Sequence, residues 1–138
     1  MLDTPVIRGM IGAVEMLIRR AEWQMEPAPD GGVEARETAE FVDSCRRDMR
    51  TPWEDTLAEI LSFLPYGFSL HEVVYKRRLG AAGRPPSAHD DGRIGWDEWS
   101  PRPQDTVAEW VWDEWNRAVG FVQQAPNRAQ PVTIPLSR

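Results

Sequence analysis

The sequence predicts an α+β fold, in which N-terminal helices are followed by a mostly antiparallel sheet. Apolar residues recur at helical spacing over much of the first 64 residues, a pattern typical of amphipathic helices. From about residue 68 onward, short runs rich in valine, isoleucine and aromatic residues alternate with polar residues, which favours strands. A run of helices followed by a run of strands is typical of an α+β protein.

The first helix is expected over residues 5–21. Thr4 can cap it, and Pro5 suits its first turn. Its apolar face has the spacing i, i+3, i+4 and consists of Val6, Ile7, Met10, Val14, Leu17, Ile18 and Ala21. The alternation in Trp23–Glu26 then predicts a short strand, which ends in a loop rich in proline and glycine.

Two further helices are predicted before residue 65. One runs from about Val33 to Met49. The other begins at Thr51, which can cap it and form a capping box with Glu54. This helix is expected to end before Pro65, since the residue preceding a proline disfavours helical geometry.

The C-terminal half is predicted to consist of strands and turns. A strand over residues 68–78 leads into an exposed, mobile loop at about 79–92. Residues 114–117 are the expected turn of a hairpin. The strands predicted after the loop are residues 93–99, 107–113, 119–123 and 132–136. Prolines at both ends of the last one restrict it to a sheet edge.

Composition narrows the classes of function. The net charge is -6, and an acidic domain is poorly suited to holding duplex phosphates over a broad face. The longest apolar runs are far shorter than the ~20 residues needed to span a bilayer. The N-terminus lacks the layout of a signal peptide, so secretion is not indicated. The one cysteine, Cys45, fits a small core residue best.

Candidate catalytic chemistry is sparse. His71 and Glu72 match the first two residues of a zinc-protease motif, but Tyr75 stands where the second histidine would be needed, and the segment is strand-like. His89 lies beside two aspartates in the predicted loop, which supplies too few ligands for a defined metal site. We therefore predict no catalytic, cofactor-binding or metal-binding residue.

Tryptophan is unusually abundant, with seven residues in 138. Five of them crowd one stretch and are the candidate protein-interaction residues: Trp96, Trp99, Trp110, Trp112 and Trp115. Base stacking is disfavoured because residues 96–115 are acidic, whereas single-strand binders combine stacking with a basic groove. Core and sheet packing is the other alternative for these residues.

Five stretches occur in a distinctive order. They are Asp3–Arg8 with Arg20–Pro27, Phe41–Val42 with Trp53–Leu57, Leu64–Tyr75, Arg93–Trp96 with Pro101–Pro103, and Phe121–Gln124 with Val132–Pro135. The third, LPYGFSLHEVVY, is the most telling. Through these stretches the chain resembles the portal proteins of tailed phages, in particular the Mu-like branch, over nearly its whole length.

The resemblance implies a structural role. Portal subunits form a ring at one vertex of the capsid, and DNA passes through it during packaging and ejection. The implied partners are other portal subunits, capsid proteins and the packaging motor, with no cofactor and no catalysis. The implied location is the virion, after synthesis in the bacterial cytoplasm.

The resemblance also implies a single wing-like domain over residues 1–138. Members of the family continue into a stem and a clip. The chain is thus expected to be an N-terminal piece of a portal, a truncated prophage product, or a small protein that keeps the wing-like region.

Two alternatives stay open. One is an acidic, Trp-rich adaptor that binds a protein partner, and the other is a small enzyme centred on His71 and Glu72. The arginines around the predicted loop are too few for a DNA track: Arg77, Arg78, Arg84 and Arg93. We therefore expect no tight duplex binding and no membrane association.

Overall fold

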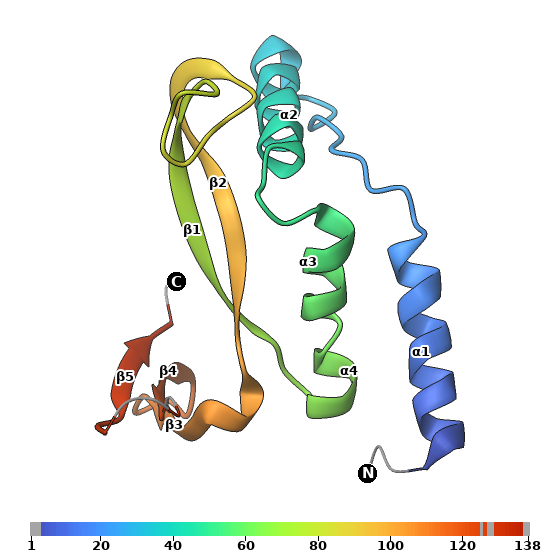
Figure 1. Cartoon of the computed structure of the whole chain (residues 1–138), viewed down its shortest axis with the longest axis vertical. Helices are drawn as coiled ribbons and strands as arrows, with labels where there is room; N and C mark the ends of the chain where they lie inside the picture. The colour runs from blue at the N-terminus through green and yellow to red at the C-terminus, as the bar shows by residue number, and fades with distance from the viewer. Residues whose placement is uncertain (1–3, 125, 127–128, 137–138) are drawn as a thin grey trace. The chain divides into compact units, whose positions relative to one another are not determined.

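The computed structural model describes residues 4–124, 126 and 129–136 (Figure 1). The chain divides into two compact units, one ending at Pro101 and the other beginning at Arg102. Helices occupy the N-terminal part, and antiparallel strands in two sheets follow, which confirms the α+β prediction. The single wing-like domain stays a prediction.

The first helix, α1, spans Pro5–Arg19. Thr4 is its N-cap and accepts a backbone hydrogen bond from Arg8, but its side chain makes no capping bond. The helix ends two residues earlier than predicted because the Ala21 N–H turns back to the carbonyl of Ile18. Among the helices described, none is both long enough and apolar enough to cross a membrane.

The strand predicted at Trp23–Glu26 is wrong. This stretch is extended but belongs to neither of the sheets described. Its backbone has no neighbouring strand to complete a ladder, and Trp23 instead packs edge-on against Trp53 with ring centroids 6.1 Å apart.

The next helices are α2 at Gly32–Arg47, α3 at Trp53–Ile60 and the short α4 at Phe63–Tyr66. The predicted capping box is not formed, because Pro52, one residue after Thr51, takes the N-cap position and its carbonyl accepts the N–H bonds of Asp55 and Thr56. The prediction that this helix ends before Pro65 is confirmed, because α3 ends at Ile60. This proline lies inside α4, where it is tolerated because the first N–H groups of a helix lack partners in any case.

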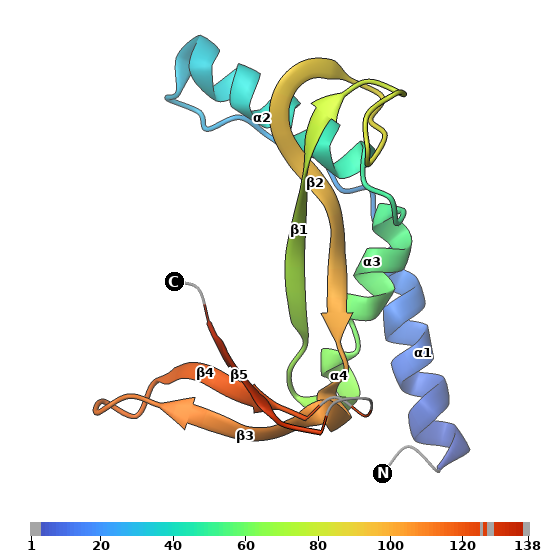
Figure 2. The ribbon, with the colours of Figure 1, turned by 60° about the vertical axis from the view of Figure 1, so that its left-hand side comes forward.

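Two long strands, β1 (Leu70–Leu79) and β2 (Asp90–Arg102), form a two-stranded sheet (Figure 2). The strand predicted at 93–99 is thus longer than expected. The Gly80 N–H donates to the carbonyl of His89 at 2.8 Å and closes the hairpin. The C-terminal part of α2 lies against this hairpin. The buried apolar residues of this unit are Cys45, Met49, Leu57 and Leu61.

The second unit is a three-stranded antiparallel sheet in the order β3 (Val107–Trp112), β4 (Ala118–Gln123), β5 (Val132–Pro135). A 3-10 turn, η1 (Gln104–Thr106), precedes it. The predicted hairpin and the predicted edge position of the last strand are confirmed. Phe121 of the central strand is 3% exposed and forms the core of this sheet.

Candidate interaction surfaces

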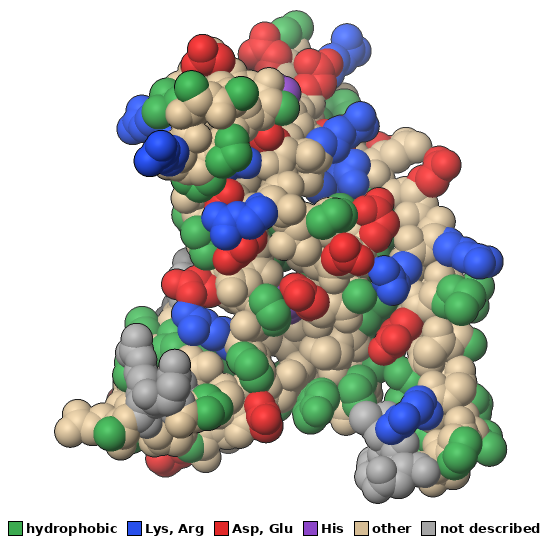
Figure 3. Space-filling view, viewed as in Figure 1, with side chains coloured by type: hydrophobic (Ala, Val, Ile, Leu, Met, Phe, Trp, Pro, Cys, Tyr) green, Lys and Arg blue, Asp and Glu red, His purple; other side chains and the backbone are tan. Residues whose placement is uncertain are grey.

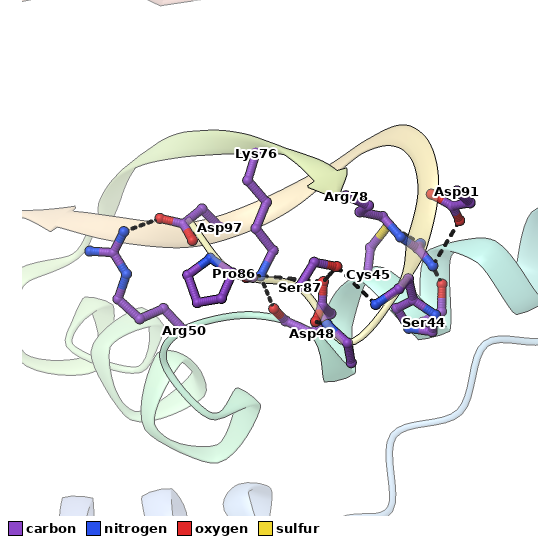
Figure 4. Close-up of polar contacts among 12 residues, drawn as sticks. Ser44, Cys45, Asp48, Arg50, Lys76, Arg78, Pro86, Ser87, Asp91 and Asp97 are labelled. Atoms are coloured by element: carbon purple, nitrogen blue, oxygen red, sulfur yellow. Dashed lines mark hydrogen bonds and ion pairs between the residues drawn. The ribbon is translucent and has the colours of Figure 1, made fainter. Parts of the chain in front are cut away.

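A buried ion pair joins the end of α2 to the β1–β2 hairpin. The Lys76 ammonium lies 3.3 Å from the Asp48 carboxylate, and the two side chains are 3% and 7% exposed. Lys76 also donates to the backbone carbonyls of Asp48 and Pro86. The Ser87 hydroxyl donates to the same carboxylate at 2.6 Å and the Ala88 N–H at 2.7 Å (Figure 4). The connecting loop is therefore tied to α2, and the exposure predicted for it is wrong at Ser87, which is buried because it completes this network.

The environment of Asp48 determines its charge. Burial raises the pKa of this carboxyl, but the hydrogen bonds from Ala88, Ser87 and Lys76, together with the lysine charge, outweigh burial. The net result is a pKa below the usual value of 3.8. Asp48 is thus ionised at neutral pH and serves as the acceptor at the centre of the network.

Arg78, the next inward-facing residue of β1, is also buried. Its guanidinium donates to the Ser44 hydroxyl at 2.8 Å and pairs with Asp91 at 3.0 Å (Figure 4). Phe41 of α2 contacts two cations, with Arg78 at 5.2 Å and Arg93 at 3.4 Å from its ring centroid. Arg77 also donates to the Gly92 carbonyl at 3.3 Å, so three of the four arginines around the loop bind protein groups.

A pocket of about 310 Å³ lies beside this network. Its ionisable lining includes Asp97, which is 1% exposed and pairs with Arg50. Asp48 and Lys76 line the same pocket and pair with each other. Because these groups neutralise one another, the pocket fits a packed junction better than a site for a charged ligand.

Four tryptophans form a chain of edge-to-face contacts in the first unit. Trp53 lies between Trp23 at 6.1 Å and Trp99 at 5.8 Å, and Trp99 contacts Trp96 at 5.3 Å. Two of the five candidate interaction residues, Trp96 and Trp99, are thus engaged in packing between helix α3 and strand β2.

The other three candidates lie in the second unit. Trp110 packs on Phe121 at 6.1 Å, whereas Trp112 and Trp115 are 55% and 67% exposed at the tip of the β3–β4 hairpin. The guanidinium of Arg117 lies 4.9 Å from the ring centroid of Trp115. The tip therefore presents two large aromatic side chains to its surroundings.

The turn that carries these side chains is well supported. The Asp113 carboxylate accepts the N–H groups of Trp115 at 3.0 Å and Arg117 at 2.9 Å, and it pairs with the Arg117 side chain. Asn116 has a φ of 59°, the left-handed conformation that asparagine tolerates well. An aspartate turn thus replaces the commoner Asn-Gly sequence.

His71 holds the two strands of the hairpin together. Its Nε2 lies 2.7 Å from the Ser69 hydroxyl, and its Nδ1 lies 3.4 Å from the carbonyl of Trp99 on β2. In the described part of the chain, no three His, Cys, Asp or Glu side chains come together in a way that could hold a metal ion. The position of His71 is that of a half-buried polar residue on a strand.

The outer face of α1 is a surface that sequence reasoning did not single out. Val6, Met10 and Leu17 are 67–70% exposed, and no residue of the helix is buried. Apolar side chains follow this helix in the space-filling view (Figure 3). The signal was present in the sequence, because these residues belong to the apolar face predicted for this helix.

Comparison with known protein families supplies a match over nearly the whole chain. The family model described as the portal protein of Mu bacteriophage matches residues 1–135. The match spans both compact units and includes all five stretches that carry the resemblance. None of the curated proteins compared with the chain matches it.

Proposed function

The chain belongs to the family of the portal protein of Mu bacteriophage, and from this membership we propose that it is a structural subunit of the portal vertex through which viral DNA is packaged and ejected. The family match over residues 1–135 is the observation that carries the proposal. Its partners are other portal subunits in a ring of about twelve copies, capsid proteins and the packaging motor.

The internal chemistry of the first unit supports a structural role. Two of its buried charged residues, Lys76 and Asp97, pair with Asp48 and with Arg50, and these pairs hold α2 and the segment after it to the hairpin. A catalytic acid or base would need to face a substrate instead.

The exposed hairpin tip supports contact with a protein partner. Tryptophan is enriched among the residues that dominate interface energies, and the Asp113 turn already holds the backbone of Trp115 in place. We assign the contact to Trp112 and Trp115, and Trp110 supports the same sheet by packing on Phe121, whereas Trp96 and Trp99 serve the packing of the first unit. The same tip favours the second candidate function, an acidic adaptor that binds a protein partner outside the virion.

Tight binding to duplex DNA is not part of the proposal. Arg78 is buried and Arg93 lies against Phe41, so the basic residues near the loop do not form a continuous exposed track. A channel subunit that lets DNA slide gains nothing from salt-sensitive phosphate contacts.

The test is to locate the protein in particles. An epitope-tagged chain should be found by immunogold labelling at a single vertex, in about a dozen copies. Replacing both Trp112 and Trp115 by Ser should reduce incorporation into particles, whereas Ile94→Ser, at another highly exposed apolar residue, should not. Particles that lack the tagged protein, while it co-purifies with a host protein, would establish the adaptor function instead.

A further inference from the structure

The outer face of α1 is apolar over a wide arc. Val6, Met10 and Leu17 are spaced four and seven residues apart, so they lie one above another on the same side of the helix. Val14, four residues after Met10 and three before Leu17, adds to this face and is 43% exposed. Contiguous exposed apolar surface of this kind marks an interaction site.

A second apolar surface lies on α2. A groove of about 490 Å³ runs between this helix and the extended segment before it. Small side chains of α2, Ala35 and Ala39, form one wall with Val42, and Met25 and Pro27 form the other. The groove can therefore accept large apolar side chains from outside.

The two surfaces carry opposite charge. Residues 5–20, which contain α1, include three arginines and one glutamate, a net charge of +2. Residues 25–42, which form the groove, include five acidic residues and one arginine, a net charge of -4. Glu26 and Glu34 line the groove directly, and Arg8 and Arg20 are exposed on and just after α1. Charge complementarity of this kind selects the partner and its orientation.

The helix cannot fill the groove of its own chain. α1 packs along α3, and the Arg19 side chain pairs with Asp55 of that helix at 3.4 Å. Both views place the N-terminal part of α2 at the opposite end of this unit from the start of α1 (Figures 1 and 2). A pair of α1 faces from two copies would bring like charges together, which disfavours that arrangement.

We propose that the outer face of α1 in one copy of the chain packs into the α2 groove of the next copy. One patch meets a different patch, so the contact is heterologous and can repeat around a ring. The proposal deepens the proposed function, because it identifies the surfaces by which neighbouring subunits would recognise each other.

Disulfide trapping tests the geometry. Leu17→Cys places a thiol on the helix face and Ala35→Cys places one in the groove. The natural Cys45 is buried and serves as an internal control. After mild oxidation, a chain with both substitutions should give a ladder of covalent oligomers on a non-reducing gel. A mixture of the two single variants should stop at the dimer, and each single variant alone should stay monomeric.

The same experiment can overturn the proposal. If Leu17→Cys alone forms dimers as readily as the mixture, the helix faces pair with each other. If the chain with both substitutions forms no covalent oligomers as its concentration is raised, the two surfaces do not meet.

Charge reversal tests the pairing independently. In the chain that carries Leu17→Cys, the added substitutions Arg8→Glu and Arg20→Glu should lower the yield of trapped dimer by about ten-fold, the effect of a modest like-charge repulsion. In the chain that carries Ala35→Cys, the substitutions Glu26→Arg and Glu34→Arg should lower the dimer yield by a similar factor. Combining the two reversed chains should restore the yield, and Arg77→Glu, at an exposed position on β1, should leave it unchanged. Failure of the combined chains to recover would refute the charge pairing.

These outcomes are separable from the proposed function. A protein found at the portal vertex that gives no trapped ladder keeps its function and refutes this interface. A ladder from a protein that never enters particles would support the interface and refute the function.

Discussion

Replacing Lys76 by Met should destabilise the first unit by about 3 kcal/mol, the low end of the cost of breaking a buried ion pair. The methionine fills much of the space of the lysine stem but leaves the Asp48 carboxylate, 7% exposed, without its counter-charge. The low end applies because Asp48 keeps two hydrogen bonds, at 2.6 Å from Ser87 and 2.7 Å from Ala88.

Urea unfolding followed by tryptophan fluorescence measures this cost, since Trp53 and Trp99 lie in the same unit. At a slope of ~1–3 kcal/mol/M, a loss of 3 kcal/mol lowers the midpoint by about 1–3 M. Arg77→Met is the matched control. Arg77 is the neighbouring residue on β1, is exposed, and makes one hydrogen bond of 3.3 Å to Gly92, so its loss should cost no more than about 0.5 kcal/mol.

A second variant keeps the prediction testable if Lys76→Met does not fold. Lys76→Met combined with Asp48→Asn removes both charges and should recover part of the lost stability. The reasoning is refuted if Lys76→Met and Arg77→Met unfold at the same urea concentration, because the buried pair would then contribute nothing beyond a surface contact.

Three further predictions concern other properties. The pKa of Asp48 is lower in the folded chain than in the unfolded chain, so the ionised carboxylate stabilises the fold above about pH 4, and this stabilisation is lost as the pH falls through the folded-state pKa. Urea midpoints measured from pH 7 downward should therefore depend less on pH in Asp48→Asn than in the unsubstituted chain. Gly120→Ala should destabilise the second sheet, because its Cβ would lie 2.8 Å from the Ile134 carbonyl oxygen, whereas Gly9→Ala, with no atom within 4 Å, should raise the melting temperature. Fluorescence anisotropy should detect no binding of a labelled duplex at physiological salt, and salt-sensitive binding that Arg77→Ala abolishes would contradict this.

Local sequence patterns determined most of the secondary structure. The helical spacing of α1 and the alternation in β3 and β4 are properties of neighbouring residues, and the elements formed where these patterns predicted. Pro131 and Pro135 placed β5 at an edge, because proline cannot donate a ladder hydrogen bond. The family resemblance was likewise readable from short motifs in order, and the match over residues 1–135 confirms it.

The roles of individual side chains needed the tertiary structure. Lys76 and Arg78 lie in a run of three cations that is typical of an exposed strand, yet both are buried. Their partners, Asp48 and Ser44, are more than 25 residues away along the chain, so no local pattern could indicate the pairing. The same holds for Ser87, which a loop-like composition assigned to solvent.

The tryptophans show most clearly which properties the sequence determined and which only the tertiary structure decided. The order of residues alone established that five of them cluster in residues 96–115 and that base stacking is disfavoured in so acidic a stretch. Folding then separated them, since Trp99 packs on Trp53 while Trp112 and Trp115 project from a hairpin tip. The physical reason is that burial depends on which distant segments fold against a side chain, and residue type and spacing report only the tendency to be buried.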